Sequence, residues 1–111
     1  MRPAVAIAML DRQLAAHGSP ISLRREGASP LTADVLGFPR RADPKNLAAG
    51  ISQDVRSVTI SPTGLDGWEP LPRKGDLLRV GAGAFGNIEA AEVVSVAGVP
   101  VRINLIVMDA G

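Results

Sequence analysis

Hydrophobic and polar residues alternate along the C-terminal half of the chain in a pattern typical of β-strands. The clearest run is Val99–Met108, in which every second residue is aliphatic. A period of two sustained over this length predicts a strand with one face in a core. The residues expected on that face are Val99, Val101, Ile103, Leu105 and Val107.

Three more strands are predicted on the same grounds: Val55–Ile60, Leu77–Val80 and Ile88–Val96. Their alternation points to a common core with the last strand. The inward residues expected from them include Val58, Ile60, Leu78 and Val80. Ala97-Gly98 separates the final two strands and predicts a two-residue hairpin.

The N-terminal part, residues 1–18, predicts an amphipathic helix. Pro3 suits the first helical turn, where a missing N–H costs little, and Gly18 is expected to end the helix. The apolar positions at helical spacing are Ile7, Leu10 and Leu14. Asp11 interrupts the apolar run too early for a leader peptide or a membrane span, so no membrane association is expected.

Two short strands are predicted next, over Ile21–Arg25 and Leu31–Phe38, the second ended by Gly37 and Pro39. A long polar loop is expected over 39–53, where no period is sustained. Its basic and apolar residues are candidates for an inter-subunit or DNA-channel contact, ordered only in an assembled particle. These candidates are Arg40, Arg41, Lys45, Leu47 and Ile51.

Together these elements predict a mainly β fold: one domain, 1–111, with a helix followed by a small antiparallel β-barrel or sandwich over 20–108. The core must be aliphatic, because aromatic residues make up only 3% of the chain. Trp68 is expected to cover one end of it. The low aromatic content also disfavours a stacking platform for single-stranded nucleic acid.

The charge is balanced, with 12 basic and 11 acidic residues and a net charge of +1, which disfavours a dedicated nucleic-acid binder. The basic pairs are expected to be solvated at turns or strand edges. They are Arg24-Arg25, Arg40-Arg41 and Arg73-Lys74. The chain has no cysteine, which excludes disulfides and thiolate metal sites.

No signature of an enzyme is present, so neither catalytic residues nor cofactors nor metals are expected. The single histidine, His17, is placed at the predicted helix end rather than in a catalytic motif. Glu89 and Glu92 could meet only across a bulge. The glycine-rich link Gly81–Gly86 lacks the lysine and the following helix of a phosphate loop.

The whole pattern resembles the head–tail joining proteins, also called stopper or head-completion proteins, of lambda-type bacteriophages. The helix leads through Gly18 into a short strand, and Thr32–Gly37 precedes the long polar loop. Lys74-Gly75-Asp76, a turn before an alternating strand, is the best-matching piece, and a strand pair closes the chain. The Gly81–Gly86 link, which has little bulk or charge, departs from the family pattern.

The resemblance implies a small barrel without catalytic residues that forms a homo-oligomeric ring, a hexamer or dodecamer, in the neck of a virion. Its implied partners are a portal or adaptor ring on the head side and a tail-completion protein on the tail side. Passing DNA would touch it transiently and without sequence preference. The source would be a phage, a prophage or a gene transfer agent, with the protein made in the bacterial host cytoplasm.

Other classes of function remain open at this point. A tail-completion or tail-tube subunit of the same kind of particle would bind the tail end alone or would polymerise. A small non-catalytic binding barrel would need a basic or aromatic face. A small enzyme is the least favoured class.

Overall fold

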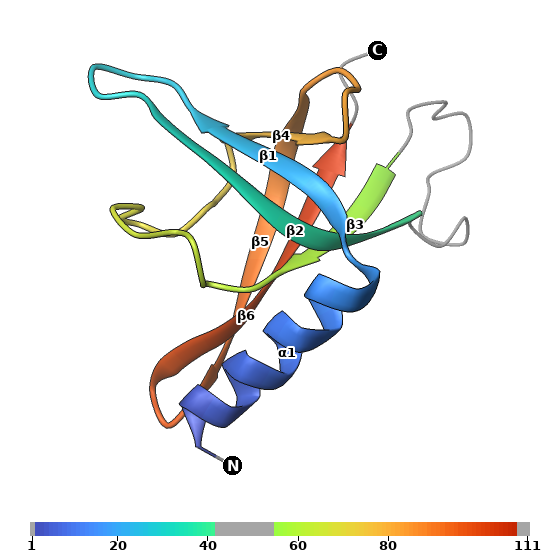
Figure 1. Cartoon of the computed structure of the whole chain (residues 1–111). Helices are drawn as coiled ribbons and strands as arrows, with labels where there is room; N and C mark the ends of the chain where they lie inside the picture. The colour runs from blue at the N-terminus through green and yellow to red at the C-terminus, as the bar shows by residue number, and fades with distance from the viewer. Residues whose placement is uncertain (1, 42–54, 109–111) are drawn as a thin grey trace, which may run out of the picture.

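Antiparallel strand pairing closes the chain into a barrel with a helix on its outside (Figure 1). The computed structural model describes residues 2–41 and 55–108. Within them, the six strands follow one another around the barrel in the order β1–β2–β3–β6–β5–β4. The elements are α1 (Pro3–His17), β1 (Ser19–Arg25), β2 (Leu31–Arg41), β3 (Val55–Ile60), β4 (Leu77–Val80), β5 (Gly86–Val96) and β6 (Val99–Met108). The predicted fold class is confirmed, and it takes the barrel form.

The inward faces of the strands supply an aliphatic core, as the alternation predicts. On β6, Ile103, Leu105 and Val107 are all buried. The other members of the core cluster are Ile21, Leu23, Val58, Ile60, Leu65, Trp68, Leu78 and Ile88. Val80 packs against this cluster while only partly buried. Burying one such side chain contributes about 1.5–3 kcal/mol, so the cluster is the main source of stability.

The predicted burial of Val99 is wrong, because the ladder between β5 and β6 is irregular near the hairpin. The pairs flanking the irregularity are Val94 with Arg102 and Ser95 with Pro100. Val101 therefore has no opposite residue, and an extra residue of this kind interrupts strict alternation. As a result Val99 is 43% exposed, whereas Ile103 is fully buried.

The helix α1 lies outside the barrel against β6 and β2 (Figure 1). Leu10 and Leu14 are its buried residues, in agreement with the predicted amphipathic spacing. The helix ends at His17, and Gly18 follows in an extended conformation with φ −75°. Space rather than a positive φ favours glycine here, because an added Cβ would lie 2.5 Å from the carbonyl oxygen of Leu14.

Strand β2 is longer than the sequence predicts and continues through Pro39 to Arg41. Its pairing with β1 ends at Gly37, and its pairing with β3 begins there. Pro39 thus has a strand neighbour on one side only, where proline is tolerated. Arg40 and Arg41 therefore belong to a strand and not to the predicted loop 39–53, and the rest of that range lies outside the described residues.

The segment between β3 and β4 is fixed to the barrel by a buried ion pair. Trp68 reaches from this segment into the core and is buried, as expected. Arg25 donates from Nε and Nη2 to the two carboxylate oxygens of Asp76, at 2.9 and 2.7 Å. Its guanidinium carbon lies 4.7 Å from the centre of the Trp68 ring, and its Nη1 donates to the carbonyl oxygen of Pro70 at 2.8 Å. The hydrogen bond and charge of Asp76 raise the pKa of Arg25, against the opposing effect of burial.

Candidate assembly interface

The basic end of β2 is the first candidate surface, because the sequence predicts an inter-subunit or DNA-channel contact there. Arg40 is exposed and lies opposite Ser57 of β3. Arg41 pairs in register with Arg56, so these two strand ends carry neighbouring arginines. Three residues of the predicted contact lie outside the described residues: Lys45, Leu47 and Ile51. In the described residues, this candidate surface is therefore a basic strand end that carries two consecutive arginines, Arg40 and Arg41.

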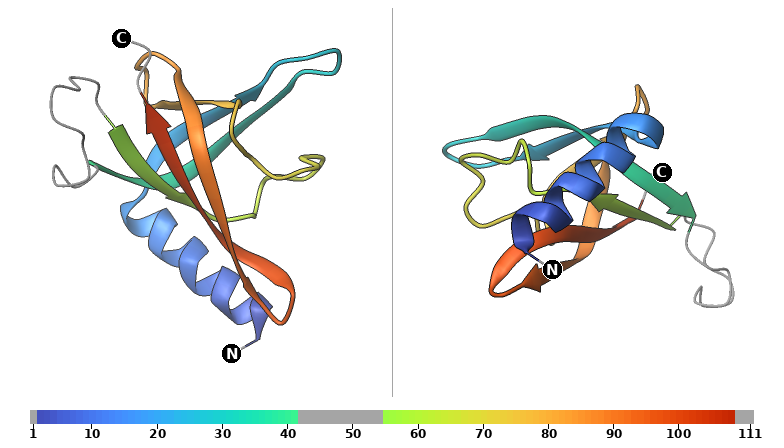
Figure 2. Two further views of the ribbon diagram at one scale, coloured as in Figure 1. Left: turned by 180° about the vertical axis from the view of Figure 1, so that it is seen from behind. Right: turned by 60° about the horizontal axis from the view of Figure 1, so that its bottom comes forward.

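A second candidate is β5, which extends far beyond its neighbour on one side. β4 pairs with β5 only at Gly86 and Asn87, and the backbone of Ile88 makes the last hydrogen bonds on that side. From there to its end, β5 pairs with β6 alone among the described strands. In the rear view, β5 lies at the front of the molecule with β6 along one side (Figure 2). We call Glu89–Val96 the β5 edge, because its second side presents backbone N–H and C=O groups with no strand partner in the described part of the chain.

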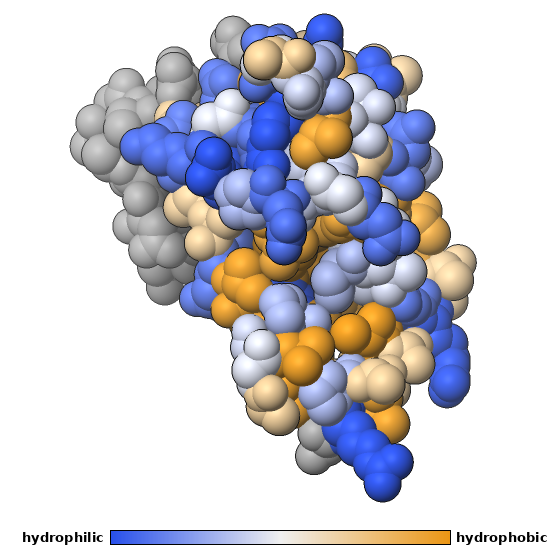
Figure 3. Space-filling model, turned by 90° about the vertical axis from the view of Figure 1, so that its left-hand side faces the viewer, coloured by the Kyte–Doolittle hydropathy of each residue, from blue (hydrophilic) through white to orange (hydrophobic). Residues whose placement is uncertain are grey.

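The β5 edge is exposed on both faces. Every residue from Glu89 to Ser95 is exposed. Val93, which lies across from the core residue Ile103, is nevertheless 42% exposed, and Val94 on the other face is 38% exposed. In the space-filling view, hydrophobic residues lie at the surface among charged ones in the lower half of the molecule, the half that contains the β5–β6 hairpin (Figure 3). Proteins commonly protect such edges with lysine or proline, and this segment contains neither.

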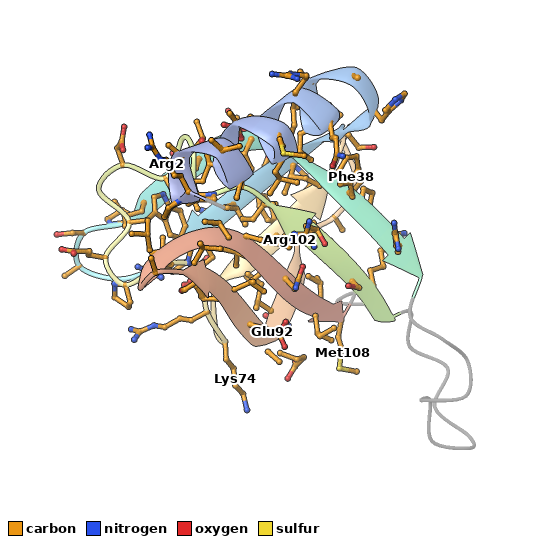
Figure 4. The ribbon with its side chains drawn as sticks, turned by 90° about the horizontal axis from the view of Figure 1, so that it is seen from below. Arg2, Phe38, Lys74, Glu92, Arg102 and Met108 are labelled. Carbon is orange, nitrogen blue, oxygen red and sulfur yellow. The ribbon has the colours of Figure 1, made fainter. Side chains whose placement is uncertain are left out.

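The two carboxylates of the β5 edge, Glu89 and Glu92, occupy different kinds of position in the β5–β6 ladder. Glu89 is the extra residue of a bulge between Ile88 and Ala90. Glu92 lies opposite Asn104, whose side-chain amide donates to Glu92 Oε1 at 3.2 Å (Figure 4). The described residues contain no group of three or more His, Asp or Glu side chains placed to hold a metal ion. The β5 edge is therefore an acidic and apolar strand, with one carboxylate held by a neighbouring amide.

The outer face of β1 and β4 carries a cationic and aromatic cluster that sequence reasoning did not identify. The guanidinium carbons of Arg79 and Arg24 lie 4.8 and 5.8 Å from the centre of the Phe85 ring, within the range of cation–π attraction. Arg79 Nη2 is 3.5 Å from Ser22 Oγ, while its buried Nε has no hydrogen-bond partner among the described residues. Arg24 approaches Glu26 at 3.9 Å, with both side chains largely exposed. The sequence feature that could have revealed this cluster is Phe85, an aromatic residue within the glycine-rich link Gly81–Gly86.

For two of the predicted basic pairs, Arg24-Arg25 and Arg73-Lys74, the structure shows whether the side chains are exposed as expected. Arg24 is exposed as expected, but the prediction is wrong for Arg25, which is largely buried against Asp76. Strand alternation explains the difference, because consecutive residues of β1 point to opposite faces. Arg73 and Lys74 are exposed as expected, and Lys74 points away from the barrel (Figure 4).

No protein-family model matches the chain, and no curated protein or solved structure matches it. In the described residues, no helix is both long enough and apolar enough to cross a membrane.

Proposed function

We propose that this protein is a structural subunit of the connector between the head and the tail of a bacteriophage-type particle, a stopper or head–tail joining protein. Its copies form a ring, a hexamer or dodecamer, that completes the DNA channel and docks the tail. The observation that carries the proposal is the closed barrel with an N-terminal helix and a free strand edge. The barrel with an N-terminal helix is the architecture that the sequence resemblance implies, and the free strand edge is an addition from the structure.

Physical arguments support a ring component. A rigid barrel can present exposed strands to neighbouring copies, and head-to-tail contacts close into a ring when their rotation allows it. The exposed apolar residues of the β5 edge suit a surface that is covered on assembly.

The charges fit a conduit for DNA rather than a tight DNA-binding site. The net charge of +1 gives the whole protein little attraction for a polyanion. Arg40 and Arg41 place local positive charge at one strand end, where contacts to phosphate would be independent of sequence. In this proposal the portal or adaptor ring lies on the head side and the tail-completion protein on the tail side. The site of action is the virion neck, after synthesis in the host cytoplasm.

Deletion of the gene from a particle-producing genome tests the proposal. We expect DNA-filled heads and complete tails that remain unjoined, with leakage of DNA from the heads. Purified protein added to the mixture should restore joining, and a heat-unfolded sample is the matched control. Normal numbers of joined particles after deletion would overturn the proposal.

A tail-completion or tail-tube subunit is the alternative that one observation also favours. A free strand edge can support open-ended polymerisation as well as a closed ring. The same deletion separates the two, because loss of a tail subunit would leave short or missing tails instead of complete unjoined ones.

A further inference from the structure

We propose that the outer face of α1 docks, in a second copy of this chain, into a hollow of the segment between β3 and β4. The contact joins two different surfaces, so it runs head to tail from copy to copy and can close into a ring. As a description of the ring contact, the inference rests on the proposed function. The docking itself is a property of two copies of the chain and can be measured without a particle.

The first support is that the first turns of α1 are apolar on all sides. Every residue from Pro3 to Leu10 is apolar, and a run of this length makes about two helical turns. A helix that is apolar all round is typical of a buried helix. The barrel covers only one side, where Leu10 and Leu14 are buried, and Val5 and Met9 on the other side are 47% and 46% exposed. We therefore expect a second surface to cover them.

The exposed side of α1 is basic as well as apolar. One stripe along it, which we call the helix stripe, consists of Arg2, Val5, Met9 and Arg12 at helical spacing. Its two arginines are exposed, and neither forms an ion pair within residues 2–41 or 55–108. Asp11, the one acidic residue of α1, accepts a hydrogen bond from Thr63 Oγ1 at 2.7 Å and is held beside the turn after β3. Arg102 of β6 lines a small hollow beside Met9 and adds to the positive charge.

The second support is a hollow with the opposite charge. It has a volume of about 580 Å³, which is in the range of ligand pockets. The segment between β3 and β4, which projects on the left of the molecule in Figure 1, supplies all of its lining except Pro100 of β6. Its apolar lining residues are Leu65, Trp68, Pro70, Leu71 and Pro100. Asp66 and Glu69 also line it, both exposed, and neither has a hydrogen-bond or ion-pair partner in the described part of the chain.

The negative charge of this hollow is not cancelled by its own lining, since none of the lining residues is basic. Arg25 donates to the carbonyl oxygen of Pro70, but its charge is paired with Asp76 at 2.7 Å. Arg73 and Lys74 follow in the chain without lining the hollow. The hollow is therefore apolar and acidic, whereas the helix stripe is apolar and basic.

The helix stripe also suits the hollow in the order of its residues. Val5 and Met9 lie one turn apart, a spacing at which a helix presents apolar anchors to a groove. They would cover the apolar wall of the hollow, while the arginines at the ends of the stripe would meet its exposed carboxylates. The two surfaces come from different copies, because Leu10 and Leu14 hold the opposite side of the helix against its own barrel. Two helix stripes would not pair with each other, since their arginines would repel.

Engineered cysteines test the contact, because the natural chain contains none. A contact through a single hollow is small and therefore weak between free copies, so the protein is held at several hundred micromolar. Under mild oxidation, Met9→Cys combined with Asp66→Cys should give a ladder of covalent dimers, trimers and larger species. The matched control is Ala15→Cys with Asp66→Cys, because Ala15 is exposed on α1 outside the stripe, and it should give no ladder. Absence of a ladder from the first variant would overturn the inference, as would a covalent dimer from Met9→Cys alone.

Charge reversal gives an independent measurement at four exposed sites, where substitution should leave the thermal midpoint unchanged. Arg2→Glu with Arg12→Glu should weaken self-association in sedimentation roughly tenfold, and Asp66→Arg with Glu69→Arg should do the same. All four substitutions together bring opposite charges back into contact and should restore association. A fourfold variant that associates as weakly as either pair would contradict the docking.

A control variant and the fluorescence of Trp68 show whether the hollow itself is covered. Arg73→Glu with Lys74→Glu reverses two exposed charges outside both surfaces and should not weaken association. Trp68 is the only tryptophan and lines the hollow, so its emission should change with protein concentration. Association without this change would place the contact elsewhere and overturn the inference. Monomers that instead bind vesicles of anionic phospholipid would show a lipid occupant of the helix stripe, with the same consequence.

The two proposals fail in different ways. If the variant Arg2→Glu with Arg12→Glu supports normal head–tail joining while deletion of the gene abolishes it, the function stands and the docking is wrong. If the ladder forms but deletion leaves joining intact, the docking stands and the connector function is wrong.

Discussion

Arg25 and Asp76, 51 positions apart in the chain, form a two-bond ion pair that fastens the segment before β4 to strand β1. Both side chains are largely buried, at 14% and 6% exposure. Asp76 Oδ2 also accepts the backbone N–H of Arg73 at 2.9 Å, which closes the turn that precedes β4. The same arginine covers Trp68, so a single pair organises the irregular side of the barrel.

Asp76→Ala should destabilise the protein by about 3–5 kcal/mol, because it leaves the Arg25 charge buried without its partner. Chemical denaturation measures the free energy of unfolding. The control is Glu26→Gln, which removes an exposed pair with Arg24 and should cost less than about 1 kcal/mol.

The Asp76→Ala effect should not fade between neutral and mildly alkaline pH. The pKa of Arg25 is raised in the folded state, so the stabilising contribution of the pair is fully present below the ordinary pKa of arginine, which covers this pH range, and is lost as the pH rises through the folded pKa. If Asp76→Ala and Glu26→Gln lowered the free energy of unfolding by equal amounts, the Arg25–Asp76 pair would not stabilise the fold more than an exposed ion pair does.

Ile103→Ala should cost about 2–5 kcal/mol through the cavity that it leaves in the core. Val99→Ala, in the same strand, should change stability little, because Val99 lies beyond the bulge and is exposed. Thermal unfolding of both variants checks this expectation. A midpoint that falls equally for the two would mean that the strand keeps strict alternation.

Gly37→Ala should destabilise the barrel where β2 passes from its pairing with β1 to its pairing with β3. An added Cβ would lie 2.8 Å from Ile21 Cγ1 and 3.0 Å from Ile60 Cγ2, both in the packed core. We expect a loss of about 1–3 kcal/mol from overpacking. Gly83→Ala is the control, since its nearest contact would be an ordinary 3.4 Å.

Ala97→Asn should stabilise the hairpin between β5 and β6. Ala97 has φ 50° and Gly98 has φ 80°, the positive pair that a type I′ turn requires and that Asn-Gly adopts most readily. The left-handed conformation costs alanine about 1 kcal/mol, and most of this should be recovered as a higher thermal midpoint. Ala97→Val, which is β-branched, should lower the midpoint. An increase with valine would contradict the turn geometry.

Replacing Arg40 and Arg41 with glutamate should weaken binding to duplex DNA equally for all sequences. The slope of log affinity against log salt should become shallower by roughly 0.9 for each phosphate contact that is lost. Fluorescence anisotropy at low salt measures both effects. Glutamate at Arg73 and Lys74 is the matched control, and equal losses in the two double variants would mean that the strand end has no special role.

The local pattern of hydrophobic and polar residues was sufficient to predict the strands that have one buried face. The alternation in β3, β4 and β6 predicted their limits and most of the core, because the period of a pleated strand is fixed by its own backbone. The helix ended where expected, and the hairpin turn at Ala97-Gly98 could be recognised from two residues. These features depend on neighbours in the chain, so the sequence predicts them directly.

Features that depend on pairing across the barrel could not be predicted in this way. The continuation of β2 past Pro39 needs β3 beside it, and the exposure of Val99 needs a ladder that skips Val101. Arg25 is largely buried while Arg24 is exposed because Arg25 forms an ion pair with Asp76, which lies 51 positions further along the chain.

Alternation and helical spacing along the chain were enough to predict a six-stranded, mainly β domain with an aliphatic core and an N-terminal helix. Closure of the sheet and the parting of β4 from β5 after Asn87 depend on how the strands meet in space, and they leave an acidic and apolar strand edge open among the described residues. The reason is physical: side-chain periodicity records which face of a strand is buried, but the hydrogen bonds at its edges are made by a backbone that every residue shares.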